Sequence, residues 1–183
     1  MLPDEGTVRV AAHDVCRDGL VVRRHTGLAL GDDRSLFWRL NGRRNLEFFG
    51  RLLGLRGRSL SVRVEEVLAD VDLADVAERR VDRFSTGMRS RLGIARALLV
   101  KPMVLLLDEP TRSLDPVATS AVRGIVRRIA DEHGTTVILA THDLEEAASI
   151  ADEVAVLADG QIAALLPAPV DTGELGRRLR SRR

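Results

Sequence analysis

The chain has 183 residues and a formal net charge of +1, with 45% apolar and 30% charged residues. This length suits one domain with a hydrophobic core, and the composition excludes a wholly disordered or fibrous chain. The balanced charge argues against binding nucleic acid by charge alone, and the single cysteine, Cys16, excludes an internal disulfide and a cysteine-based metal site.

Short β-type runs separated by turns are expected in the first thirty residues. Residues 7–10 and 27–30 are rich in aliphatic side chains, and a basic, turn-forming stretch lies between them. We therefore predict a small sheet in this part of the chain.

The segment 41–99 is predicted to be largely helical. A first helix starts near Asn45, where apolar side chains recur at helical spacing and two glycines then end it: Leu46, Phe49, Leu52, Leu53, Gly54 and Gly57. A second helix is expected over 62–69. A third follows Ser85 and has Met88, Leu92, Ala95 and Leu99 on one face. It ends at Lys101 and Pro102, because proline does not continue a helix.

A strand, a helix and a second strand are predicted next. Residues 103–107 and 136–140 are apolar runs typical of buried strands, the first of them buried on both faces. Between them, Asp115 is the expected N-cap and Pro116 the first residue of a helix that closes near Gly134 and buries Val122, Ile125, Val126 and Ile129. This βαβ order predicts an α/β fold with a mostly parallel sheet and helices on both faces.

The last part of the chain is predicted to form a hairpin and a basic tail. Residues 154–157 and 161–165 are joined by Asp159 and Gly160, a typical hairpin turn. From Pro167 onward we expect loop and frayed helix, with basic residues at Arg177, Arg178, Arg180, Arg182 and Arg183.

Two acids, Asp108 and Glu109, follow the apolar run 103–107 and are the first candidates for chemistry. The carboxyl end of a parallel strand is where open α/β sheets bind ligands. Charge there is costly unless it is paired or bound to a cation, and a phosphate-bound Mg²⁺ is such a cation. The alternative is a strand that simply leads into an acidic loop.

The second candidate is the segment Ser85, Thr86, Gly87, Met88 and Arg89, which opens a predicted helix. The backbone N–H groups and the positive dipole end of a helix N-terminus suit an anion such as phosphate. Serine is also an ordinary N-cap, so this segment taken alone leaves both interpretations open.

Four short motifs occur in one order along the chain, and together they resemble the ABC ATPase family. Their order is Ser85 to Arg89 as the signature, Asp108-Glu109 as Walker B, Ser113-Leu114-Asp115 as the D-loop and His142 as the switch histidine. The resemblance implies a partial RecA-like P-loop NTPase core with an inserted helical subdomain. It makes residues 1–183 a single truncated ABC ATPase domain, with 1–40 and 100–166 as the core, 41–99 as the helical subdomain and 167–183 as a basic tail.

By this resemblance, each residue of the motifs has an expected role. Glu109 orients or deprotonates the attacking water, Asp108 holds Mg²⁺, His142 contacts the γ-phosphate and Asp115 links two sites. Ser85, Thr86, Gly87 and Met88 hold ATP that is bound to a partner subunit. Asp32 or Asp33 stands where the family has the glutamine of its Q-loop, so the chain departs from the pattern there.

The phosphate-binding sequence Gly-x-x-x-x-Gly-Lys-Ser/Thr is missing from these 183 residues. Their only lysine is Lys101, which is followed by Pro102 and lacks the required glycines before it. We therefore expect a chain truncated after its P-loop, in which binding of ATP and Mg²⁺ is weak or absent and hydrolysis by the chain alone does not occur.

The expected partners are a second ABC ATPase subunit and transmembrane permease subunits, and no nucleic acid. No run reaches the roughly 20 apolar residues that span a bilayer, so we expect a cytoplasmic protein held at the inner face of the membrane by its permease. The wording of the signature is similar to that of multidrug and polysaccharide exporters. The alternatives are an inactive regulatory subunit, or a remnant able only to supply the signature to a partner site.

Overall fold

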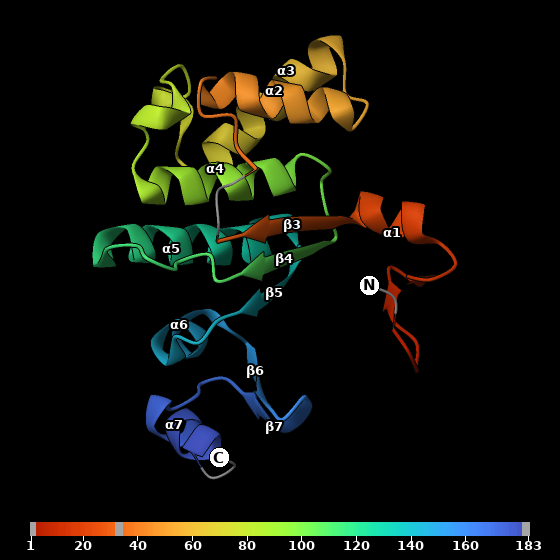
Figure 1. Cartoon of the computed structure of the whole chain (residues 1–183), viewed down its shortest axis with the longest axis vertical. Helices are drawn as coiled ribbons and strands as arrows, with labels where there is room; N and C mark the ends of the chain where they lie inside the picture. Colours follow the sequence, from red (N-terminus) through yellow and green to blue (C-terminus); the bar gives the residue numbers. More distant parts are fainter. Residues whose placement is uncertain (1–2, 32–34, 181–183) are drawn as a thin grey trace. The chain divides into compact units, whose positions relative to one another are not determined.

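The computed structural model describes residues 3–31 and 35–180 (Figure 1). The chain forms two compact units, divided between Ile138 and Leu139. Most of the predicted elements lie in the first unit, and each unit is described below by itself.

The first unit begins with a minimal antiparallel pair, β1 (Arg9–Val10) and β2 (His13–Asp14), followed by the helix α1 (Gly19–His25). The helix α1 was not predicted. None of its residues is buried, so it carries no apolar periodicity that could have revealed it. Three basic residues in its last turn, Arg23, Arg24 and His25, instead stabilise the helix by interacting with the negative end of its dipole.

The main sheet has the order β3 (Thr26–Leu30), β4 (Val104–Asp108) and β5 (Thr136–Ala140). β3 and β4 pair in parallel, as predicted for the later strands, so the α/β prediction is confirmed. The prediction that 27–30 belongs to a small sheet with the first run is wrong, because β3 pairs with a strand more than seventy residues further along the chain.

The expectation that the run 103–107 is buried on both faces is also wrong, because Val104 and Leu106 of β4 are only half-buried. Ala29, Leu105 and Leu107 share one face and are at most 4% exposed. The opposite face includes Leu28 and Leu30, each 50% exposed, and no residue of β5 is fully buried. The reason is that α4 packs against β3 on one face, whereas the described residues of this unit leave the other face open.

Three helices pack together beside this sheet: α2 (Gly42–Leu52), α3 (Gly57–Asp70) and α4 (Thr86–Leu98) (Figure 1). Two short 3-10 turns, Ala74–Val76 and Val81–Arg83, connect α3 to α4. The helical prediction for 41–99 is confirmed, although Gly57 opens a helix rather than ending one. The core here consists of fully buried aliphatic side chains, among them Leu46, Leu68, Leu73, Leu92, Ile94 and Leu98.

The helix α5 (Pro116–His133) follows its prediction closely. Asp115 is the N-cap, and its side chain accepts a hydrogen bond from the Ala118 N–H. Gly134 ends the helix in the left-handed conformation, which glycine adopts without strain. The four predicted inward residues are buried: Val122, Ile125, Val126 and Ile129.

The second unit contains α6 (Leu144–Ile150), β6 (Glu153–Ala158), β7 (Gln161–Pro167) and α7 (Thr172–Arg180). The predicted hairpin is confirmed as β6 and β7, with positive φ at Asp159 and Gly160 in its turn. The helix α6, which has only seven residues, was not predicted. No helix among the described residues is long and apolar enough to cross a membrane.

Glu146 on α6 is completely buried, and neither of its carboxylate oxygens has a hydrogen-bond partner among the described residues. We expect Glu146→Met to raise the free energy of unfolding by roughly 1 to 3 kcal/mol, because it removes this desolvation cost at similar side-chain length. Denaturant melts of the full chain measure the change. The control is Glu145→Met in the same turn, where the exposed side chain carries no such cost; equal effects of the two variants would contradict the prediction.

Candidate functional site

The ends of β3 and β4 approach each other very closely at Gly31. The Gly31 N–H donates to the Asp108 carbonyl oxygen over 2.7 Å. A Cβ atom at position 31 would lie 2.1 Å from the Glu109 carbonyl oxygen, so only glycine fits there. Glu109 itself has a φ of +50°, which is unusual for a residue with a side chain.

Asp108 and Glu109 therefore stand at the carboxyl end of β4, as the sequence predicted. Asp108 is exposed and Glu109 is half-buried. Within the ranges 3–31 and 35–180, no three acidic, histidine or cysteine side chains gather closely enough to hold a metal ion by themselves. An exposed carboxylate at a strand end nevertheless fits Mg²⁺, which keeps several waters and takes other ligands from substrate phosphates.

The signature residues form the first turn of α4. Ser85 is the N-cap, and its hydroxyl oxygen accepts a hydrogen bond from the Met88 N–H over 3.2 Å. Arg89 donates to the Phe84 carbonyl oxygen over 2.6 Å and lies over the Trp38 ring. The N-cap interpretation of Ser85 is confirmed, and Ser85 and Thr86 are exposed at a helix N-terminus, where an anion is favoured.

The segment from Glu109 to Asp115 turns sharply between β4 and α5. The Arg112 N–H donates to the Glu109 carbonyl oxygen over 3.1 Å, and Ser113 has a φ of +63°. The Asp115 carboxylate accepts from the Ala118 N–H over 2.9 Å. The predicted D-loop is thus a tight turn that ends in a capped helix.

The structure brings this turn against α4. The buried Ser90 hydroxyl donates to the Pro110 carbonyl oxygen over 2.7 Å. A Cβ atom on Gly87 would come within 2.8 Å of the Ala118 Cβ. Ser90 and Ala118 are not among the predicted site residues. Their small side chains lie on two helices, α4 and α5, that approach each other closely. The sequence does not show this approach, so it could not reveal their role.

The remaining predicted site residues lie elsewhere. His142 is exposed and belongs to the second unit, immediately before Asp143, which caps α6 through the N–H groups of Glu145 and Glu146. Asp32 and Asp33 lie outside the described residues, between Gly31 and Ser35.

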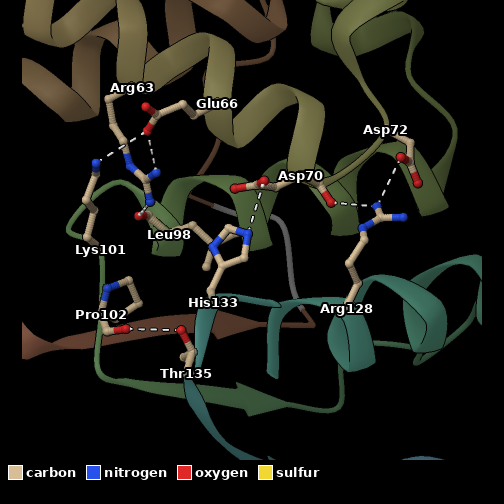
Figure 2. A network of polar contacts seen from close by, with 10 residues as sticks. All are labelled: Arg63, Glu66, Asp70, Asp72, Leu98, Lys101, Pro102, Arg128, His133 and Thr135. Atoms are coloured by element: carbon tan, nitrogen blue, oxygen red, sulfur yellow. Dashed lines mark hydrogen bonds and ion pairs between the residues drawn. The ribbon is translucent and has the colours of Figure 1, made fainter. Parts of the chain in front are cut away.

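A second polar cluster joins α3, the end of α4 and α5, and the sequence did not predict it (Figure 2). Arg63 donates to the Leu98 carbonyl oxygen and, over 2.8 Å, to Glu66. The Arg63 hydrogen bond, together with the nearby charge of Lys101, lowers the pKa of Glu66 below its ordinary value.

The same cluster continues to α5, as Figure 2 shows. Arg128 donates to the Asp70 carbonyl oxygen over 2.8 Å and to the Asp72 carboxylate over 3.0 Å. His133 lies 3.4 Å from the Asp70 carboxylate. These contacts pair acids with bases, so the cluster holds the end of α3 against α5 and its role is structural.

The fold closely matches a solved structure of a component of an ABC transporter complex. The structure of CbiO1 from Clostridium perfringens, described as part of the ABC transporter complex CbiONQ, aligns with a TM-score of 0.85 and 25% identity. The alignment covers 97% of this chain and 70% of CbiO1. The parallel sheet, the acid pair at its strand end and the capped helix α4 therefore define an ABC-type ATP-binding domain.

Curated relatives agree with this class. The chain is 44% identical to the daunorubicin resistance ATP-binding protein DrrA3 of Streptomyces coeruleorubidus, over 88% of this chain and 51% of the relative. It is 31% identical to the ABC transporter ATP-binding protein NatA of Bacillus subtilis, over 87% of this chain and 65% of the relative. The chain thus spans about half to two thirds of the relatives' lengths.

The profile of the ABC transporter family matches residues 1–112. The chain belongs to this family, and the resemblance found in its motifs is confirmed.

Proposed function

We propose that this chain is an ATP-binding subunit of an ABC exporter, and that it contributes its signature helix to a nucleotide site shared with a second subunit. The observation that carries the proposal is the exposed, Ser85-capped N-terminus of α4 packed directly against the 109–115 turn. This arrangement places two motifs that the family has at its shared sites next to each other in the first unit.

In this proposal the residues keep the roles that the family resemblance implies. Ser85, Thr86, Gly87 and Met88 bind the phosphates of ATP held by the partner, since a helix N-terminus stabilises negative charge. Asp115 links the two sites. Asp108 holds Mg²⁺, Glu109 orients water and His142 contacts the γ-phosphate wherever a P-loop completes the site on the same subunit.

The 183 residues contain no P-loop sequence, so the shared site is tested with a partner subunit that carries one. A partner with its own P-loop would bind ATP, and the signature of this chain would close that site.

Export rather than import is supported by the names of two relatives, DrrA3 and DrrA2 of Streptomyces coeruleorubidus, both daunorubicin resistance ATP-binding proteins. Resistance to a drug is consistent with its removal from the cell. We propose that membrane-spanning permease subunits hold the chain at the cytoplasmic face, and that the helical segment 41–99 acts as the family's helical subdomain within a single domain.

Two substitutions of Ser85 test the shared site. The chain is co-purified with a family member that carries a P-loop, and the ATPase rate of the mixture is measured. Ser85→Asp keeps an N-cap but places a negative charge against the phosphates, and Ser85→Arg introduces bulk there. We expect each to lower the rate by at least about tenfold, the scale on which one lost charge-stabilising contact reduces catalysis.

The matched control is Ser59→Arg on the exposed face of α3, which leaves the rate unchanged. Thermal melts verify that the Ser85 variants remain folded. If the mixture hydrolyses ATP at the same rate with Ser85→Asp, Ser85→Arg and the unmodified chain, the proposed role of the signature is refuted.

A further inference from the structure

Two contacts join α4 to the turn between β4 and α5, and they start from residues one helical turn apart. Ser90 holds the Pro110 carbonyl oxygen near the beginning of the turn, over 2.7 Å. Gly87 packs against Ala118 just after its end. Because Gly87 and Ser90 lie three positions apart, they share one face of α4.

We propose that Ser90 and Ala118 are positioning residues, which hold segment 110–118 against α4. They thereby keep the signature and the D-loop in a fixed relative position when both meet a partner's nucleotide. The functional part of this inference rests on the proposed shared site. Neither residue needs to touch ATP, since each acts through the backbone or side chain next to it.

The backbone of the turn gives a physical reason why such positioning is needed. Glu109 and Ser113 both adopt positive φ values, +50° and +63°. Residues with side chains remain in that region only when surrounding contacts hold them there. The Ser90 hydrogen bond is buried, so replacing Ser90 with alanine removes the side-chain donor to the Pro110 carbonyl oxygen inside the protein.

Besides allowing a ligand to approach, the absence of a side chain at Gly87 allows α4 to pack closely against Ala118. A side chain at position 87 would strike the Ala118 Cβ and push α4 away from the start of α5. That displacement would also move Asp115, whose carboxylate is bonded to the Ala118 N–H. Gly93 on the same helix has nothing within 4 Å of an added Cβ, so it provides a matched comparison.

The first experiment measures mobility without nucleotide. Cys16 is replaced by serine, and Arg112→Cys places a spin label on the exposed turn. We expect Ser90→Ala and Gly87→Ala to increase the mobile fraction of the label roughly twofold or more, because the turn loses a restraint. Gly93→Ala should leave it unchanged.

A further control separates loosening of the turn from general loss of stability. Val64→Ala removes a fully buried side chain from α3, away from the turn, and lowers the melting temperature without mobilising the label. If Ser90→Ala mobilises the label no more than Val64→Ala does, the positioning role of Ser90 is overturned.

The second experiment uses rescue. In the mixture with a P-loop partner, Gly87→Ala is expected to reduce the ATPase rate on the order of tenfold to a hundredfold, the range produced by small misplacements of a catalytic element. Ala118→Gly makes room for the new methyl group, so the double variant should recover most of both the rate and the original label mobility.

The outcomes of the two experiments are distinguishable from failure of the shared site. No rescue by Ala118→Gly, in rate and in mobility, would mean that Gly87 serves ligand approach alone and would overturn the inference. An ATPase rate indifferent to the Ser85 substitutions would instead refute the shared site, while the mobility results would still decide whether α4 positions the turn.

Discussion

Gly31→Ala is expected to destabilise the first unit by about 3 kcal/mol or more, a cost at the upper end of overpacking substitutions. The added Cβ would lie 2.1 Å from the Glu109 carbonyl oxygen and 3.2 Å from that of Asp108. Both atoms belong to backbone, so no side chain can rotate away. The end of β3 must separate from β4, and the acid pair moves with it.

Urea unfolding of the full chain, followed by circular dichroism, measures this loss. Gly124→Ala is the control, because an added Cβ on this α5 residue meets nothing within 4 Å and alanine favours a helix. Gly31→Ala should unfold at clearly lower urea, and Gly124→Ala at the same concentration or higher. Coincident curves for Gly31→Ala and the unmodified chain would show that the strand ends are not in close contact.

Arg63→Ala is expected to cost about 2 to 4 kcal/mol of folding free energy, through a lost buried hydrogen bond and an unfilled volume. The Arg63 side chain is only 8% exposed and extends from α3 to the carbonyl oxygen at the end of α4 (Figure 2). It therefore ties the second helix of the segment 41–99 to the last turn of the signature helix.

Arg63→Met separates the two contributions, since methionine keeps most of the volume but none of the charge. Its partner Glu66 is 41% exposed and can be solvated, so we expect Arg63→Met to cost less than about 1.5 kcal/mol. Denaturant melts of both variants provide the comparison. Equal losses for alanine and methionine would mean that the hydrogen bonds of Arg63, rather than its bulk, dominate.

The same pair predicts a pH dependence. Because the pKa of Glu66 is lower in the folded chain than its ordinary value of 4.5, its contribution to stability is fully present above pH 4.5. It is lost as the pH falls through the lower folded value. In Arg63→Met the main cause of the shift is gone, so urea midpoints measured below pH 4.5 should fall less steeply than those of the unmodified chain.

The elements predicted best are those with strong local signals. α5 has an aspartate cap, a proline in its first turn, a regular apolar face and a closing glycine, and the structure reproduces all four features. The β6–β7 hairpin follows from Asp159 and Gly160. By contrast, α1 and α6 are seven residues long, too short for the apolar periodicity that identifies a helix.

The order of the motifs along the sequence indicated the family by resemblance, and the family profile and the relatives confirmed it. The three-dimensional fold decided which face of the sheet is covered and that only glycine fits at position 31. It also decided that α4 contacts the chain on both sides of the D-loop, at Pro110 and at Ala118. These contacts join residues that are distant in sequence. The apolar pattern of a helix or strand shows which of its faces is apolar, but not which element packs against that face.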